Sequence, residues 1–192
     1  MVLQSDGSLA ERMTSRADPA GVFRARLERV KAGDMGALGD MFAEYGDEVF
    51  RAAARLTGSR ADADDVTQEL FVRLPSAARG FTGSAAQFPA WIRRVAVRQA
   101  LMAMRGGRRR REVSVDRVAT LTMAADNPHD RLTINAALER LSDEHRTVFL
   151  LKEVEGYAHT EIAELLGIST ANSEVRLHRA RRQLRDLLRE SQ

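Results

Sequence analysis

The stretch GYAHTEIAELLGISTANSEVRLHRARRQL, from Gly156 to Leu184, reads as a short helix, a tight turn and a longer helix rich in arginine. Gly167 stands where the first helix needs a left-handed C-cap, and Ser169 is a good N-cap for the second. This order predicts a helix-turn-helix, whose second helix can enter a DNA major groove. An amphipathic helical hairpin with a solvated basic face fits the same pattern, so this segment alone leaves both interpretations open.

The composition favours an all-α protein of one large or two small domains. Alanine, leucine and arginine are abundant, proline is scarce, and no alternation of apolar and polar residues lasts long enough to indicate a sheet. The chain has no cysteine, which excludes a disulfide framework, a thiol nucleophile and a cysteine-ligated zinc site. It has no apolar run of membrane-spanning length and no signal-peptide core, so we expect a cytoplasmic protein without membrane insertion.

Charges of opposite sign lie in different parts of the chain. The net charge is +3, and the basic charge is nearly all arginine, which suits bidentate contact with phosphate and guanine. Separated clusters predict two partner surfaces. The acidic cluster consists of Asp62, Asp64, Asp65 and Glu69, and the basic one of Arg93, Arg94, Arg98, Arg105 and Arg108 to Arg111.

Helical periodicity predicts two small helical bundles, at 22–106 and 132–192, joined by a flexible linker at 107–131. Residues 1–21 are expected to be disordered. Pro75 is expected to end or kink its helix, and Asp143 to cap the helix that leads into the helix-turn-helix. An intact single domain remains an alternative. The individual helices are expected at 22–32, from 34 through Phe42, at 47–56, from 61 or 62 to Pro75, and at 89–105.

Two segments resemble the extracytoplasmic-function sigma factors, the smallest bacterial sigma factors of RNA polymerase. RADADDVTQELFVRL, followed after a loop by FPAWIRRVAV and a basic run, looks like the promoter-melting domain of that family. LERLSDEHRTVFLLKEVEGYAHTEIAELLGIS, followed by RLHRAR, looks like the domain that reads the minus-thirty-five element. The resemblance covers about residues 22 to 188. It implies a promoter-specificity subunit with no catalytic residue, no metal and no cofactor.

The resemblance implies that the acidic helix docks on a coiled coil of the polymerase β′ subunit. Carboxylates on this helix could pair there with arginines. An ordinary acidic helix start, favoured by the helix dipole, is the alternative. The residues expected to bind polymerase are Asp62, Asp65, Gln68 and Glu69.

The loop at 81–87 and the basic helix after it are where the resemblance places the melted minus-ten element. The loop would capture a flipped base, and the arginines would hold the phosphates of the separated strand. The loop could instead have no role, and Trp91 fits a core anchor better than a base platform because Ile92 and Val95 beside it are apolar. The expected contacts are Phe81, Thr82, Ser84, Gln87, Trp91, Arg93, Arg94, Arg98 and Arg105.

The resemblance places the minus-thirty-five contacts on the second helix of the helix-turn-helix. The chain departs from the family there, because Glu174 stands where a basic contact is usual and Val175 follows it. We therefore expect an unusual minus-thirty-five preference. Arg98 and Met102 replace a family Asn and Asp, which leaves the minus-ten base choice open. The expected contacts are Thr170, Asn172, Ser173, Glu174, Arg176, His178 and Arg179.

The partners implied by the resemblance are core RNA polymerase, through its β′ coiled coil and β flap, promoter DNA, and an anti-sigma factor. Two other classes of function remain open. A stand-alone helix-turn-helix regulator would need a ligand pocket or dimer interface within 22–105. A nuclease could bind magnesium through Asp62, Asp64 and Asp65, although adjacent side chains on a helix diverge by about 100°.

Overall fold

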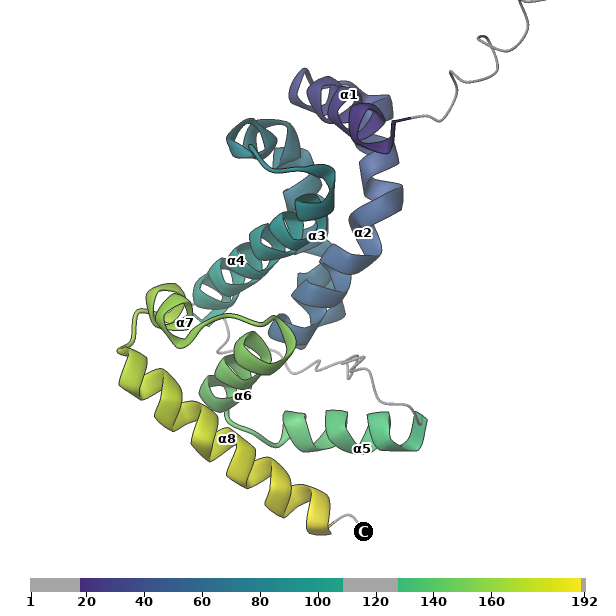
Figure 1. Ribbon diagram of the computed structural model, residues 1–192. Helices are drawn as coiled ribbons and strands as arrows, with labels where there is room; N and C mark the ends of the chain where they lie inside the picture. Colours follow the sequence, from purple (N-terminus) through teal and green to yellow (C-terminus); the bar gives the residue numbers. More distant parts are fainter. Residues whose placement is uncertain (1–17, 109–127, 191–192) are drawn as a thin grey trace, which may run out of the picture.

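The computed structural model describes residues 18–108 and 128–190, and within these ranges every regular element is helical (Figure 1). The all-α prediction is therefore confirmed, and none of the described helices is long and apolar enough to cross a membrane. The N-terminal half contains α1 (Pro19–Lys31), α2 (Met35–Thr57), α3 (Arg60–Ala77), the 3-10 turns η1 (Ala78–Gly80) and η2 (Ala85–Gln87), and α4 (Phe88–Arg108). The C-terminal half contains α5 (Pro128–Glu139), α6 (Asp143–Phe149), the π turn η3 (Leu150–Val154), α7 (His159–Leu166) and α8 (Thr170–Glu190).

Helix α2 is one continuous helix, so the prediction of two helices with a break before residue 47 is wrong. Met41, Tyr45 and Val49, four residues apart, form one buried stripe across the expected break. Gly46 is also buried, and a Cβ built on it would lie 3.6 Å from the ring of Phe42. Continuous burial of one face keeps the helix intact, although glycine lowers helix propensity by about 1 kcal/mol.

Pro75 does not end α3, so the part of the prediction that placed a helix end there is wrong. The helix starts at Arg60, where the backbone N–H of Asp62 donates to Ser59 Oγ at 3.2 Å, and it continues to Ala77. Pro75 stands two residues before the last residue, Ala77, so the hydrogen bond that its missing N–H removes, to the carbonyl of Phe71, lies near the C-terminal end of the helix. Fully buried Leu74 anchors that turn in the core.

Several predicted boundaries shift by a few residues. Helix α1 starts at Pro19, because Asp18 accepts a hydrogen bond from the N–H of Ala20 at 3.1 Å. Ser142, not Asp143, caps α6. Helix α5 begins at Pro128, inside the expected linker. The remaining part of that linker, 109–127, and the expected disordered residues 1–17 lie outside the described residues.

An aromatic cluster fixes the start of α4 within the N-terminal half. Phe88 is fully buried, and the rings of Phe23, Tyr45, Phe81 and Trp91 surround it at centroid distances of 5.1 to 5.3 Å. Edge-to-face aromatic pairs at such distances stabilise a core beyond their buried area. This cluster holds the loop before α4 against the body of the N-terminal half.

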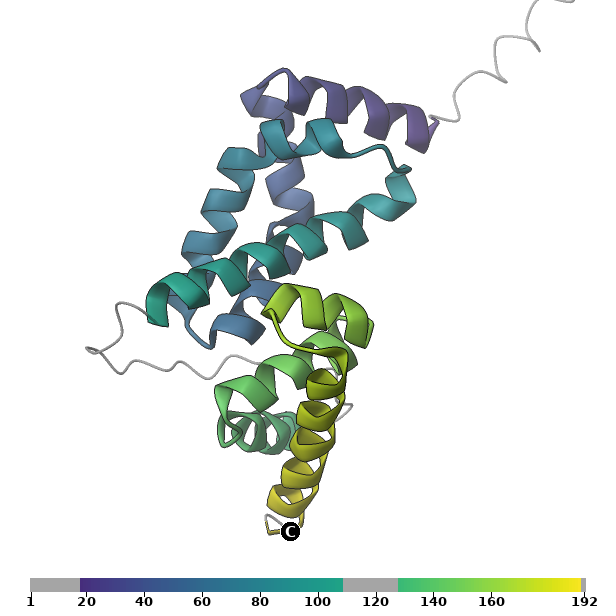
Figure 2. The same ribbon diagram turned by 90° about the vertical axis from the view of Figure 1, so that its left-hand side faces the viewer.

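A second apolar cluster joins the two halves, which the sequence did not predict. Figures 1 and 2 both show the C-terminal half against the ends of α2 and α4 that lie farthest from α1. Each half leaves apolar side chains at this end, and burying them together removes them from water. The buried members include Leu56, Val66, Val97 and Leu101 from the N-terminal half, and Leu138, Leu150, Leu151, Ile162 and Leu184 from the C-terminal half.

Candidate nucleic-acid interface

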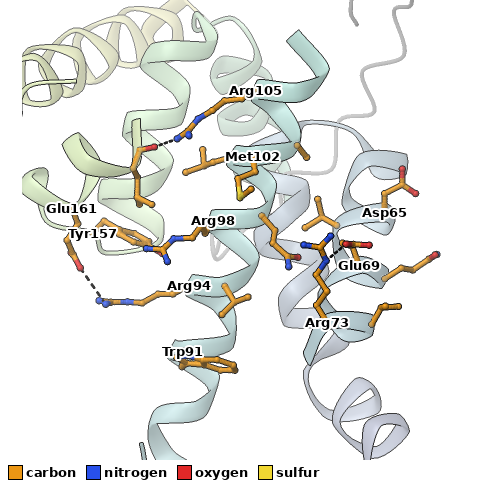
Figure 3. A pocket seen from close by; sticks show the side chains of 18 of the residues that line it. Asp65, Glu69, Arg73, Trp91, Arg94, Arg98, Met102, Arg105, Tyr157 and Glu161 are labelled. Carbon is orange, nitrogen blue, oxygen red and sulfur yellow. Dashed lines mark hydrogen bonds and ion pairs between the residues drawn. The ribbon is translucent and has the colours of Figure 1, made fainter. Parts of the chain in front are cut away.

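Helices α3, α4 and α7 line a cleft of about 1410 Å³ between the two halves (Figure 3). The structure thereby brings three of the predicted polymerase-binding residues and four of the predicted strand-binding residues to two walls of one cleft. The third wall comes from the segment around α7, which the sequence analysis did not connect with either group. The lining residues used below are Asp65, Gln68 and Glu69 from α3, Trp91, Arg94, Arg98 and Arg105 from α4, and Tyr157, Glu161 and Leu165 from the C-terminal half.

The acidic wall on α3 is open to solvent. Asp65, Gln68 and Glu69 are exposed, and Asp62, in the first turn, is partly exposed. Glu69 forms an ion pair with Arg73 one turn later. Exposed pairs of this kind contribute about 0–1 kcal/mol, so the pair does not prevent Glu69 from binding another cation.

The basic wall on α4 is largely engaged by the C-terminal half. Arg93 Nε lies 3.5 Å from Glu155 Oε2, and Arg94 Nη1 lies 3.4 Å from Glu161 Oε1. Arg105 donates a hydrogen bond to the carbonyl oxygen of Leu165. Of the four predicted strand-binding arginines on α4, these three therefore contact the C-terminal half, and Arg98 is exposed beside them in the cleft.

The segment before α7 supplies two buried side chains to this contact. The Glu155 side chain is 1% exposed, and its Oε1 accepts hydrogen bonds from Arg55 Nε at 3.0 Å and Nη2 at 2.5 Å. Tyr157 lies under the guanidinium of Arg94, 5.5 Å from ring centroid to Cζ. Burial raises the pKa of the Tyr157 phenol, while nearby Arg94 acts in the opposite direction. No local sequence pattern indicated Glu155, because its partner Arg55 is 100 residues away.

The loop at 81–87 has a buried floor and an exposed rim. Phe81 is 7% exposed and packs on Trp91, whereas Thr82, Ser84 and Gln87 are exposed. Gln87 Oε1 accepts hydrogen bonds from the N–H and the hydroxyl of Ser84, at 2.8 and 3.2 Å. A Cβ at Gly83 would meet the Phe81 ring at 2.7 Å, so only glycine fits this turn.

Trp91 packs against the aromatic core and keeps part of its surface in the cleft. This position agrees with the core-anchor interpretation of the sequence. Phe81 likewise belongs to the core rather than to the exposed rim, so in this conformation its ring is not open to a base from the cleft side.

The helix-turn-helix has the predicted local chemistry. Gly167 ends α7 with φ 68, in the left-handed region, and the N–H of Asn172 donates to Ser169 Oγ at 3.1 Å at the start of α8. Leu177, Ala180 and Leu184 are buried, as expected for the inner face. The opposite face exposes predicted contacts Asn172, Glu174, His178 and Arg179, together with Val175, and leaves Thr170 partly exposed.

Two other predicted contacts on α8 already have partners in the protein. Ser173 is fully buried, and its Oγ lies 2.9 Å from His159 Nδ1, so it joins α7 to α8 instead of facing solvent. Arg176 Nη2 lies 3.1 Å from Glu144 Oε2, and its Nε donates to Asn172 Oδ1 at 3.1 Å. These contacts hold Arg176 in a defined orientation along the recognition helix.

The described residues contain no group of three or more His, Cys, Asp or Glu side chains placed to hold a metal ion. Asp62, Asp64 and Asp65 therefore form no such group, and neighbouring side chains along α3 diverge by about 100°.

Comparison with known proteins decides the family. The description "Sigma-70 region 2" matches residues 41–110, and "Sigma-70, region 4" matches residues 131–184. ECF RNA polymerase sigma factor SigL of Mycobacterium tuberculosis is 33% identical over an alignment covering 86% of this chain and 97% of SigL. The chain belongs to the extracytoplasmic-function (ECF) sigma factors. It is thus a sigma factor of the type that directs RNA polymerase to promoters, a class of non-catalytic transcription regulators.

Two further proteins are similar to this chain, one by sequence and one by structure. ECF sigma factor SigE of Mycolicibacterium smegmatis is 34% identical over 78% of this chain, which spans 60% of that relative. The solved structure of CnrH in complex with the cytosolic domain of CnrY matches with a TM-score of 0.52 at 26% identity, covering 88% of this chain and 98% of CnrH. The resemblance inferred from the sequence is thereby confirmed.

Proposed function

We propose that this ECF sigma factor binds core polymerase through the acidic face of α3 and holds promoter DNA at two separate places. The observation that carries the proposal is the cleft, in which the acidic face of α3 and the arginines of α4 lie on adjacent walls. The melted strand, held by α4, would then lie directly beside the polymerase-binding surface of α3. Asp62, Asp65 and Glu69 pair with arginines of the β′ coiled coil, and Gln68 adds a hydrogen bond to that surface.

At the minus-ten element, the exposed rim of the loop receives an unpaired base. Thr82, Ser84 and Gln87 offer hydrogen bonds, and Gly83 lets the base approach the backbone. Phe81 supports the loop from below. Arg93, Arg94, Arg98 and Arg105 hold the strand phosphates, with Trp91 at the end of the same wall.

At the minus-thirty-five element, α8 enters the major groove with its exposed face. Arg176 and Arg179 contact guanine or phosphate, and Glu174 accepts from a cytosine amino group. Val175, 46% exposed, can touch a thymine methyl group. Thr170, Asn172 and His178 complete the polar contacts, while buried Ser173 positions the helix.

The proposal includes the partners and location that follow from this role. CnrH was solved with the cytosolic domain of CnrY, and by analogy we assign this chain a protein partner, which the sequence resemblance implies is an anti-sigma factor. The C-terminal half would also contact the polymerase β flap. The chain works in the cytoplasm, without membrane insertion, cofactor or catalytic residue, because polymerase performs the chemistry.

Transcription by core polymerase on a genomic template library tests the whole proposal. Added chain should direct initiation from start sites that share two upstream elements. Asp65→Lys should weaken cosedimentation with core polymerase about tenfold or more, because it reverses a charge on the docking face. Asp40→Lys makes the same change on an exposed carboxylate of α2 and should have no effect. If the wild-type chain bound promoter duplex but never cosedimented with polymerase, it would be a stand-alone regulator instead.

A further inference from the structure

We propose that His159 of α7 is a positioning residue for base recognition and acts through Ser173 of α8. The pair fixes how the first turn of α8 sits on α7, and thereby how Asn172 and Glu174 meet the base edges of the minus-thirty-five element. The inference rests on the proposed role of α8 in reading that element. It goes beyond that role because it assigns base preference to a residue outside the recognition helix.

Ser173 is the polar member of an otherwise apolar face of α8. This face consists of buried residues at helical spacing, namely Ser173, Leu177, Ala180 and Leu184. An apolar residue would suit the face better, because a buried hydroxyl without a partner costs free energy. Ser173 is fully buried, and its hydroxyl pairs with the imidazole of His159, with 2.9 Å between Oγ and Nδ1. A directional contact therefore stands here in place of an apolar one.

The contact lies at the end of α8 that the proposed function places in the groove. The N–H of Ser173 donates to the carbonyl of Ser169 at 3.0 Å, so Ser173 closes the first turn of the helix. Its neighbours Asn172 and Glu174 are exposed, and they diverge from Ser173 by about 100° to either side. A shift or rotation of α8 at Ser173 therefore moves both side chains relative to the bases.

His159 is held in place by the start of its own helix. It is the first residue of α7, which lies against the start of α8 (Figure 1). The N–H of Ala158 donates to Glu161 Oε2 at 2.8 Å, which fixes the backbone immediately before His159. A hydroxyl can both donate and accept, so the contact with Ser173 forms with either neutral tautomer of the imidazole. His159 thus offers a fixed polar atom to α8.

A hydrogen bond restrains the position of α8 more closely than an apolar contact does. It needs a donor–acceptor distance of about 2.7–3.2 Å and a nearly linear geometry, whereas burial of apolar surface has no preferred direction. Base edges are themselves read through hydrogen bonds of fixed geometry, while phosphate contacts carry no base information. The pair is therefore expected to govern base preference and to leave non-specific affinity unchanged.

Selection from duplexes with a randomised minus-thirty-five element tests the pair, with the full-length chain alone and with core polymerase. His159→Leu keeps a branched side chain but leaves the Ser173 hydroxyl without its partner. Base preference at the positions that Asn172 and Glu174 contact should fall about tenfold, whereas affinity for random duplex and its salt dependence should stay unchanged. His159→Asn places a polar atom the same number of bonds from the backbone as Nδ1 and should restore most of the preference.

The double variant His159→Leu with Ser173→Ala separates positioning from stability. It leaves no buried hydroxyl unpaired, so the unfolding free energy lost in His159→Leu should largely return. The base preference should remain relaxed, because no directional contact replaces the pair. A double variant that regains both stability and the wild-type preference would overturn the inference, since stability alone would then explain the single variant. The double variant also carries the test if His159→Leu does not fold.

His145 of α6 supplies the matched control. Its Nδ1 also contacts a side chain of α8, because it lies 3.1 Å from Gln183 Oε1. Gln183 stands about 15 Å beyond Ser173 along the helix, away from the turn that enters the groove. His145→Leu should therefore leave the base preference unchanged. An equal loss of preference in both leucine variants would overturn the particular role of His159.

The same selection separates failure of this inference from failure of the proposed function. A wild-type chain that enriches no sequence, with or without polymerase, would overturn the proposed role of α8 and the positioning role with it. If wild type and His159→Leu enrich the same sequences to the same extent, the positioning role alone is overturned and α8 still reads the duplex.

Discussion

Helices α4 and α8 are both rich in arginine, yet they present their charges in opposite ways. On α4, Arg93, Arg94 and Arg105 are engaged by the C-terminal half. On α8, Arg179 and Arg182 point to solvent. An arginine cluster in a sequence therefore indicates a potential binding surface, whereas packing determines which of its side chains already have partners in the protein. Thus Arg179 and Arg182 of α8 are exposed, whereas Arg93, Arg94 and Arg105 of α4 pair with the C-terminal half, although the Arg94 side chain remains 62% exposed.

The largest expected effect tests whether the two halves form one cooperative unit. Leu56→Ala removes a side chain that is 1% exposed in the cluster shared by both halves, and should cost about 2–5 kcal/mol of unfolding free energy. Amide hydrogen exchange should then accelerate in α8 as well as in α2. Leu74→Ala is the control, because fully buried Leu74 belongs to the cluster of the N-terminal half alone. If both variants accelerate exchange in α8 equally, the cluster that contains Leu56 does not couple α8 to the N-terminal half more strongly than the cluster that contains Leu74.

The next effect measures the availability of the two basic helices directly. Arg179→Ala should weaken binding of the free chain to promoter duplex by about 1–3 kcal/mol, because it removes an exposed contact on α8. Arg98→Ala, an exposed arginine of α4, should leave duplex binding unchanged and affect only transcription by the assembled polymerase. Fluorescence anisotropy with a labelled duplex separates the two. Equal losses in both variants would contradict separate roles for the helices.

Glu174 of α8 is expected to affect which bases are preferred in the minus-thirty-five element. Glu174→Lys should change which minus-thirty-five sequences are selected, by about 1–3 kcal/mol at one base pair, because an acid and a base prefer different groove edges. Selection of binding sites from a random duplex pool checks this. Tighter binding of the wild-type chain to random duplex than to every selected promoter would refute an unusual preference.

A smaller effect concerns the start of the recognition helix. Ser169→Ala removes the hydroxyl that accepts from the N–H of Asn172 and should cost about 1 kcal/mol in the C-terminal half. Ser59→Ala removes the corresponding cap of α3 and should cost a similar amount in the N-terminal half. Urea unfolding monitored by amide exchange assigns each loss to its half. Losses spread evenly over both halves in both variants would show that the whole chain unfolds together.

The smallest expected effect concerns the pH dependence of stability at Asp34, which lies on neither α4 nor α8. The hydrogen bond from Arg29, with a further one from the N–H of Ala37, holds the pKa of the Asp34 carboxyl below its usual value. A group with a lowered folded pKa stabilises fully above its unfolded pKa of about 3.9, and the stability is lost as pH falls through the folded pKa. Asp34→Asn should therefore be less stable than wild type at pH 6 and similar to it at the acid end. Urea unfolding across this pH range measures the difference in unfolding free energy between wild type and Asp34→Asn. A difference that grows as the pH falls would contradict the lowered pKa of Asp34.

Local features of the sequence predicted local features of the structure. Gly167 and Ser169 ended and began helices as expected, and the 3.6-residue period located the helices to within a few residues. The errors arose where packing outweighed local preference. Burial of one continuous stripe joined the two expected helices of α2, and anchoring of Leu74 carried α3 past Pro75. The roles of the candidate DNA contacts remain predictions, although burial places Phe81 and Ser173 beneath the surface.

The all-helical class, the helix-turn-helix and the membership of the ECF sigma factors could be predicted from the sequence, because they depend on periodicity, caps and motifs that lie within short segments. The tertiary structure alone decided which charges meet. Glu155 reads as one more surface glutamate in the sequence, and only folding brings it to Arg55, 100 residues away, and to Arg93. The residue types determine which groups are charged. The strength of each electrostatic interaction depends on the distance between the charges and on their burial, and both come from the tertiary structure.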